Sequence, residues 1–309
     1  MSGQRLSVYD HDRAAAGLRY VYPVVSRRAG GISVGVNLNP NNACNWRCIY
    51  CQVPGLTRGE GPALDLALLD RELRGLLDDI LRGDFMSRRV PEGARVLRDV
   101  ALSGNGEPTT SPQFAEALSV VRQVLSDQGL LGELDCVLIT NGSMLGKASV
   151  REALGDFDAM GGRVWFKLDR ATRAGMQAVN GAPGDPARHL ERLLAVSQLC
   201  RTWIQTCLFD VDLAAGQSAS QPGSDLDALR DLAEMPSLDA EVDALIAVFR
   251  GLAQRRSELS LKLEGVLLYG LARPSQQAEA PLLVPLSEAK LREFAARIEA
   301  AGLPVKLSL

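Results

Sequence analysis

Apolar positions along the chain follow two spacings, one typical of buried strands and the other of amphipathic helices. Short apolar stretches predict six strands, at residues 32–38, 99–103, 134–140, 163–169, 201–210 and 259–269. Apolar residues spaced three and four apart predict helices over 66–80, 114–125, 148–157, 185–196, 242–252 and 287–301. Strands and helices that alternate in this way are typical of parallel β/α units with right-handed crossovers.

Local signals at the ends of these elements refine the prediction. Ser111-Pro112 and Asp185-Pro186 each predict the start of a helix, and Gly302 predicts the end of the last one, before a possible short strand at 305–308. The residues between Asp169 and Asp185 are interpreted as a glycine-rich loop, and His189 as a residue on a helix surface. The polar segment 213–224 is expected to be a mobile loop or lid.

The predicted elements suggest a division of the chain into three parts. Residues 1–31 are predicted to be an irregular lead-in packed on the main domain, residues 32–270 form that domain, and residues 271–309 complete it with a loop, a helix and the short strand.

Composition narrows the class of protein. With 309 residues, 46% hydrophobic and 23% charged, the chain has the composition of a globular protein of one large or two small domains. No apolar run approaches the ~18 residues that span a bilayer, and the N-terminus is polar, so we expect no membrane association and a cytoplasmic location. The net charge of −3 gives no overall positive field for nucleic acid, although Arg27, Arg28, Arg47 and Arg58 could form a local basic patch.

Three of the six cysteines are close together, at Cys44, Cys48 and Cys51. The spacing C-x3-C-x2-C is too tight for a disulfide framework but suits three thiolates on one metal centre. A closed zinc site normally needs four ligands, and the two histidines lie far away in the sequence, so an iron–sulfur cluster with one open iron is favoured over zinc. Cys136, Cys200 and Cys207 are interpreted as small buried apolar residues.

The cysteine motif and a second motif together resemble the radical S-adenosylmethionine (SAM) superfamily. Tyr50 is the aromatic residue that precedes the last cysteine of that family's motif, and residues 103–109 (SGNGEPT) resemble its G-G-E-P loop, with Asn105 at the first glycine. The resemblance implies a partial (β/α)6 barrel of parallel strands with outer helices. It also implies a [4Fe-4S] cluster on Cys44, Cys48 and Cys51, SAM as cosubstrate, and an external one-electron reductant of the flavodoxin or ferredoxin type.

The same resemblance assigns cofactor contacts. Tyr50 would contact adenine, and Asn105, Gly106 and Glu107 would meet the SAM amino group. Further cofactor contacts are expected at the ends of strands, where β/α barrels collect their chemistry, from Asn141, Lys167, Asp169 and Gln205. Alternative roles are a turn for Asn141 and an ion pair between Lys167 and Asp169. The catalytic residues themselves are not predicted.

Several pieces of sequence resemble the wyosine-synthase-like branch, whose members modify a guanine base in tRNA. These pieces are residues 26–28, 35–38, the two motifs, residues 167–169 and Arg273-Pro274. Those members carry further cysteines before the motif for a second cluster, and this chain has none before Cys44. We therefore expect reductive cleavage of SAM and hydrogen abstraction from a small metabolite or peptide, with a tRNA base as the alternative. A non-enzymatic iron–sulfur electron carrier or a zinc-stabilised binding protein is the alternative of another class.

Overall fold

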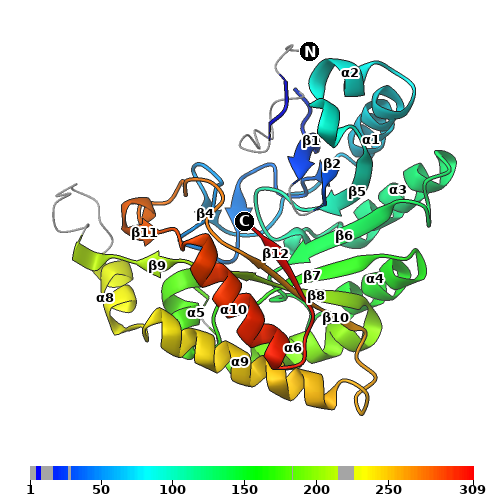
Figure 1. The fold of residues 1–309 in the computed structure, drawn as a ribbon. Coiled ribbons are helices and arrows are strands. Elements are labelled where there is room, and N and C mark those ends of the chain that lie inside the picture. The colour runs from blue at the N-terminus through cyan, green and yellow to red at the C-terminus, as the bar shows by residue number, and fades with distance from the viewer. Residues whose placement is uncertain (1–4, 8–16, 27–28, 183, 215–225) are drawn as a thin grey trace. The chain divides into compact units, whose positions relative to one another are not determined.

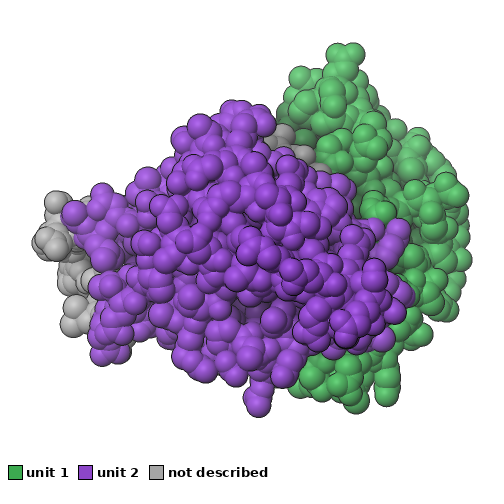
Figure 2. Space-filling model, turned by 60° about the horizontal axis from the view of Figure 1, so that its bottom comes forward, with its two compact units in different colours: residues 1–45, 59–140, 144–165 green, residues 46–58, 141–143, 166–309 purple. Residues whose placement is uncertain are grey.

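The computed structural model describes residues 5–7, 17–26, 29–182, 184–214 and 226–309. These residues group into two compact units, shown in different colours in Figure 2. The first unit comprises residues 1–45, 59–140 and 144–165, and the second comprises residues 46–58, 141–143 and 166–309. Each unit is described separately below, and the division at residues 31 and 270 expected from the sequence stays a prediction.

The main sheet contains eight strands in the order β1-β2-β5-β6-β7-β8-β10-β12. Its strands are β1 (Val21–Ser26), β2 (Gly31–Val36), β5 (Leu97–Leu102), β6 (Asp135–Thr140), β7 (Arg163–Lys167), β8 (Arg201–Cys207), β10 (Leu263–Tyr269) and β12 (Val305–Ser308). Four two-residue strands complete the set: β3 (Ala43–Cys44), β4 (Thr57–Arg58), β9 (Asp210–Val211) and β11 (Leu283–Val284).

The α-helices follow most of these strands in the chain (Figure 1). They are α1 (Leu66–Leu81), α2 (Phe85–Arg89), α3 (Phe114–Asp127), α4 (Ala148–Ala159), α5 (Arg173–Asn180), α6 (Pro186–Leu199), α8 (Leu226–Glu234), α9 (Leu238–Arg255) and α10 (Glu288–Ala300). Short 3-10 turns lie at Glu92–Ala94, Pro108–Thr110 and Ala280–Leu282. Within the described residues, no helix is long and apolar enough to cross a membrane.

In the first unit, β2, β5 and β6 are parallel neighbours, and β1 pairs with β2 in the antiparallel direction. Helices α1, α3 and α4 pack beside one another, and their apolar residues face the core. Strand β1 corrects the expectation that residues 1–31 are irregular. Pro23 is compatible with this strand because β1 is the edge of the sheet, where a missing N–H is tolerated.

In the second unit, β10 is parallel to both β8 and β12, so the short final strand expected at 305–308 is present. Helix α10 packs on β10, β12 and α9, and α6 packs on β8 (Figure 1). The mixed α/β class, with parallel strands curled into a half-barrel and helices outside, is the class predicted from the sequence.

Four local expectations were wrong. The strand expected at 259–269 begins only at Leu263, because residues 256–260 form a turn in which Ser260 has a positive φ of 51°. Helix α3 begins at Phe114 with Gln113 as N-cap, so Ser111-Pro112 does not cap it. The loop expected after Asp169 contains helix α5. His189 is 2% exposed rather than on a helix surface.

Candidate cofactor site

The G-N-G-E-P loop follows β5 and lies against the segment that leads to Cys44. Buried Asn37 accepts hydrogen bonds at Oδ1 from the backbone N–H groups of Asn39 (3.0 Å) and Asn105 (3.1 Å). The side chain of Asn105 donates to Asn42 Oδ1 (2.6 Å), and that of Asn39 donates to the carbonyl of Ala43 (3.0 Å). Within the first unit, side-chain amides therefore join the second motif to the residues before the first cysteine.

The two glycines of this loop are required for different reasons. Gly104 has a φ of +148°, which L side chains rarely adopt, whereas Asn105 is not among the described non-glycine residues with positive φ. The asparagine at the first position of the family quartet therefore fits the backbone without strain. A Cβ on Gly106 would lie 2.0 Å from the carbonyl oxygen of Ala43, so only glycine permits this close approach.

Glu107 is 3% exposed, and its Oε1 atom is surrounded by donors. It accepts from the backbone N–H of Thr109 (3.2 Å) and from the hydroxyls of Thr109 (2.5 Å) and Thr140 (2.7 Å). Because Thr140 ends β6, these bonds connect the loop after β5 with the neighbouring strand. Glu107 thus holds the loop in place, and its role toward SAM stays a prediction.

In the second unit, the cysteine loop is held by the end of helix α5. The carbonyls of Val179 and Asn180 accept from the backbone N–H groups of Ile49 (2.9 Å) and Arg47 (3.0 Å). Carbonyls in the last turn of a helix lack partners within that helix, and the loop supplies two of the donors they need. Gly181 then ends the helix with a left-handed φ of 54°.

A second segment, residues 275–279, binds the same loop from another side. The Ser275 hydroxyl donates to the carbonyl of Ile49 (2.7 Å), and the backbone N–H of Gln276 donates to that of Cys51 (2.9 Å). The Gln277 side chain donates to the carbonyls of Cys51 (3.1 Å) and Val53 (3.0 Å). We call residues 275–279 the clamp.

The clamp ends in an ion pair. Arg47 makes two hydrogen bonds to the carboxylate of Glu279, at 2.6 and 3.2 Å, and Glu279 is 4% exposed. Nearby, the Arg58 side chain donates to the carbonyl of Gly181 (2.6 Å). Two members of the expected basic patch are therefore occupied by contacts within the protein. Arg27 and Arg28 lie outside the described residues, as does most of the expected lid at 213–224.

Asp169 is the centre of a buried polar network in the second unit. Its Oδ2 atom accepts from the Tyr50 hydroxyl (2.5 Å) and from the side-chain amide of Asn180 (2.8 Å). Its Oδ1 atom accepts from the backbone N–H of Cys207 (2.9 Å). Lys167 donates to the Tyr50 oxygen (2.6 Å), and the Asn180 amide nitrogen lies 3.3 Å from the sulfur of Cys48. The Tyr50 hydroxyl is thus bonded to both Lys167 and Asp169, two other residues predicted for the site.

Buried charges surround this network. Arg170 is 1% exposed and donates to the carbonyls of Asp169 (2.8 Å) and Cys207 (3.1 Å). Glu241 is fully buried and accepts from the backbone N–H groups of Ala171 (3.2 Å) and Thr172 (3.4 Å) and from the Thr172 hydroxyl. Since Thr172 is the N-cap of α5, Glu241 fixes the start of the helix whose other end holds the cysteine loop.

Burial governs the protonation states here. It raises the pKa of the Cys48 thiol to about 11, because the effect of desolvation exceeds that of the nearby Lys167. Burial, and then the charge of Asp169, raise the pKa of Tyr50 well above its usual value. Desolvation lowers the pKa of Lys167, but neighbouring groups that include Tyr269 and Asp169 raise it more, so it stays a cation. A metal bound at Cys48 would therefore have to displace a proton.

The remaining predicted residues are placed as follows. Asn141 is buried after β6 and accepts from the backbone N–H (3.0 Å) and hydroxyl (2.6 Å) of Ser143, which is the turn that the sequence offered as an alternative. Gln205 is 2% exposed on β8. None of the six cysteines is in a disulfide; Cys44, Cys48 and Cys51 are half-buried, and the other three are buried. Among the described residues, no three Cys, His, Asp or Glu side chains are gathered as a metal site.

Sequence reasoning missed several residues of this region, namely Asn180, Glu241 and the clamp residues Ser275, Gln277 and Glu279. The sequence held signals for helix α5. Thr172 is its N-cap, Met176 and Val179 form its buried face, and Gly181 follows its last residue. No local pattern indicates the contacts of the clamp, because they join residues more than 220 positions apart.

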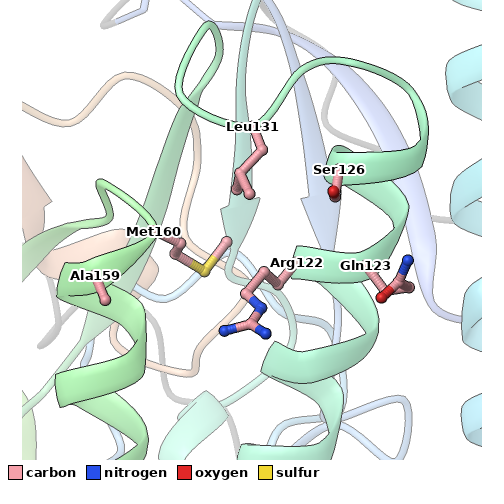
Figure 3. Close-up of a pocket in the computed structure, with 6 residues that line it drawn as sticks. All are labelled: Arg122, Gln123, Ser126, Leu131, Ala159 and Met160. Carbon is pink, nitrogen blue, oxygen red and sulfur yellow. The ribbon is translucent and has the colours of Figure 1, made fainter.

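The first unit also contains a pocket that is separate from the predicted site residues (Figure 3). It is lined by residues of α3, the loop after it and the end of α4: Arg122, Gln123, Ser126, Leu131, Ala159 and Met160. These residues precede β6 and β7, at the end of the strands opposite to the one where β/α barrels place their chemistry. None of the predicted site residues lines this pocket.

Comparisons with known proteins identify several relatives of this chain. No protein-family model matches the chain. A UPF0026 protein of Helicobacter pylori (strain J99) is 25% identical over 183 residues, which cover 57% of this chain and 51% of that protein. The UPF0026 protein slr1464 of Synechocystis is 29% identical over 161 residues, which cover 52% of each chain. The chain thus spans about half the length of the curated relatives it matches.

Solved structures also resemble the chain, among them the two that follow. HydG, a maturase of the [FeFe]-hydrogenase, has a TM-score of 0.51 and 10% identity, with coverage of 89% of this chain and 51% of that one. A radical SAM methyltransferase from Sphaerobacter thermophilus has a TM-score of 0.49 and 15% identity, with coverage of 90% and 66%. The likeness to HydG supports the fold that the sequence predicted, a mixed α/β fold with parallel strands in a half-barrel.

Proposed function

We propose that this protein is a radical SAM enzyme in which Cys44, Cys48 and Cys51 bind a [4Fe-4S] cluster and SAM is the cosubstrate. The observation that carries the proposal is the C-x3-C-x2-C loop, whose backbone in the second unit is fixed by α5 and by the clamp. The fold supports the same assignment.

The donor set fits an iron–sulfur cluster. The three thiols are half-buried and not in disulfides, so they are neither cross-linked nor enclosed in the core. Thiolates are the usual ligands of such clusters, and three of them leave one iron for another ligand. When bound, the cluster would supply an electron that cleaves SAM to a 5′-deoxyadenosyl radical, which abstracts hydrogen from the substrate.

The protein's own residues would hold the two motif loops in place and orient SAM. In the first unit, the Asn37–Asn105 contacts fix the backbone of the G-N-G-E-P loop, and Glu107 would offer a carboxylate to the SAM amino group. In the second unit, the hydroxyl of Tyr50 is bonded to Asp169 and its side chain is in the apolar core, which would keep water from the cysteine loop. Asn141, Lys167, Asp169 and Gln205 remain proposed cofactor contacts.

A small metabolite or peptide is the favoured substrate, and a tRNA base is the alternative. Phosphate backbones need clustered, available cations. The ion pair of Arg47 with Glu279 and the bond from Arg58 to Gly181 support the first choice. An external one-electron reductant of the flavodoxin or ferredoxin type would be the protein partner.

Anaerobic reconstitution tests the proposal. We expect about four irons per chain, broad visible absorption, and formation of 5′-deoxyadenosine when reductant and SAM are added. Each of Cys44→Ala, Cys48→Ala and Cys51→Ala should abolish the absorption, whereas Cys136→Ala, as a matched buried cysteine, should not. Stoichiometric zinc, or a stable cluster that never cleaves SAM, would favour the binding protein or the electron carrier instead. SAM cleavage that depends on tRNA would promote the tRNA alternative.

A further inference from the structure

Asn180 is the last residue of helix α5, and its side chain is enclosed in the second unit at 1% exposure. Its amide nitrogen lies 2.8 Å from Asp169 Oδ2 and 3.3 Å from Cys48 Sγ. An amide NH₂ group carries two hydrogens, so one nitrogen can donate to both acceptors. Sulfur accepts hydrogen bonds at longer distances than oxygen, and 3.3 Å is within that range.

The orientation of this amide follows from its surroundings. Asp169 is fixed by the Cys207 N–H on one carboxylate oxygen and by the Tyr50 hydroxyl on the other. A carboxylate oxygen repels an amide oxygen and attracts an amide N–H, so the NH₂ end of Asn180 must face Asp169. The same NH₂ end therefore faces the sulfur of Cys48.

The Tyr50 proton is oriented in the same way. The ammonium group of Lys167 can only donate, so the Tyr50 oxygen accepts from it and the hydroxyl hydrogen points to Asp169. The result is a continuous chain of donors and acceptors from Lys167 through Tyr50, Asp169 and Asn180 to Cys48. Every link in it lies within the second unit.

We propose that Asn180, oriented by Asp169, donates a hydrogen bond to the Cys48 thiolate of the bound cluster and thereby makes the cluster easier to reduce. This inference rests on the proposed function, because it requires Cys48 to be a cluster ligand. Reduction adds negative charge to the cluster and its sulfurs, and an N–H donor stabilises that charge, so hydrogen bonds to sulfur raise the reduction potential. Asn180 is thus a positioning residue that acts through a ligand.

The test is an anaerobic potentiometric titration of reconstituted full-length protein, with iron content, the g-values of the reduced cluster by electron paramagnetic resonance, and the unfolding temperature measured on each sample. The variants are Asn180→Leu, which keeps the volume without a donor, and Asn180→Ala. Gln177→Ala is the matched control, since this exposed residue lies one turn earlier on α5 and its side-chain amide donates to Asp231 (3.0 Å), away from Cys48. A purely structural role would not move the potential of a fully loaded cluster.

We expect both Asn180 variants to hold their iron and to show altered g-values. At a fixed applied potential, the ratio of reduced to oxidised cluster should fall up to tenfold, which for a one-electron couple is a shift of about 59 mV to more negative potential. The control should match the wild type. Unchanged potentials in both loaded variants would overturn the inference, and so would loss of iron from both at an unchanged unfolding temperature. Failure of the wild type to bind iron would instead refute the proposed function.

Discussion

The two units hold their motif residues with different kinds of polar groups. In the first unit, the G-N-G-E-P loop is held mainly by neutral amides and hydroxyls, and Glu107 is the one acid in the contacts described for it. In the second unit, charged residues make the contacts: Lys167 and Asp169 bond to the Tyr50 hydroxyl, and Arg170 bonds to the carbonyl of Asp169. Glu241 holds the start of α5.

This difference determines how each region responds to substitution. Loss of one member of a neutral network leaves polar groups unpaired at a cost of about 1–3 kcal/mol each. Loss of one member of a buried charged set leaves an uncompensated ion and costs about 3–5 kcal/mol. The second unit should therefore be the more sensitive, and the following variants test that difference in order of expected effect.

Asp169→Ala should have the largest effect. It removes the acceptor of three hydrogen bonds and leaves the buried Arg170 and the half-buried Lys167 without this carboxylate, so the free energy of unfolding should fall by about 3–5 kcal/mol. Chemical denaturation of the wild type and the variant measures this change in the free energy of unfolding. Asp243→Ala, which breaks an exposed ion pair with Arg297, should cost less than about 1 kcal/mol. Equal losses in the two variants would refute the comparison.

His189 should make the second unit sensitive to acid. Burial lowers its pKa to about 4, and its Nε2 atom lies 2.9 Å from the carbonyl oxygen of Lys167. The unfolded chain binds a proton below the ordinary pKa near 6.5, whereas the folded protein does so only near 4. The free energy of unfolding should therefore fall between these values, by on the order of 3 kcal/mol in total.

The variant His189→Gln keeps a donor and does not titrate, so it should show a weaker loss of stability between pH 6.5 and 4.5. Denaturation curves at both pH values measure the difference. The same pH dependence in wild type and variant would show that other groups cause the acid sensitivity.

Glu107→Ala should have an intermediate effect. The hydroxyls of Thr109 and Thr140 lose their acceptor, at a cost of about 1–3 kcal/mol, and SAM should bind more weakly while iron content is unchanged. Thr140→Val is the matched control, because it removes one of these bonds and leaves the carboxylate. If SAM binding, measured by equilibrium dialysis, is weakened equally in both variants, Glu107 acts only by holding the loop.

Gln277→Ala should have the smallest effect. It removes two bonds from the clamp to the carbonyls of Cys51 and Val53, at a cost of about 1 kcal/mol, and iron should leave the reconstituted protein faster. Gln276→Ala is the control, since Gln276 reaches Cys51 through its backbone N–H, which the substitution leaves in place. Iron release at the same rate from both variants would show that the Gln277 side chain does not stabilise the loop.

The sequence predicted the elements that carry a regular apolar pattern. Helices α1, α3, α9 and α10 and the parallel strands lie close to the expected positions, because each has a buried face with a constant period. Strand β1 was missed since its Pro23 argues against a strand unless the edge position is known. His189 was misjudged although it shares the period of Leu193 and Val196, both buried on α6.

The candidate site was predictable only in part. The two motifs are local in sequence, so their residues could be named. The contacts of Asp169 with Tyr50 and Cys207 join three separate segments, and nothing in the residues near Asp169 indicates which partners the fold brings to it. Asn180 and the clamp were missed for the same reason.

The docking of the cysteine loop on the carbonyls of Val179 and Asn180 has an electrostatic consequence. The C-terminal end of a helix carries roughly half a negative elementary charge, because its peptide dipoles are aligned. The loop from Arg47 to Ile49 binds at this negative end, which opposes the addition of an electron to any centre held there. Asn180 would therefore act in two directions, its carbonyl lowering the reduction potential of a bound cluster and its side-chain amide raising it. Through its dipole, helix α5 would thus require an electron donor that is somewhat more reducing.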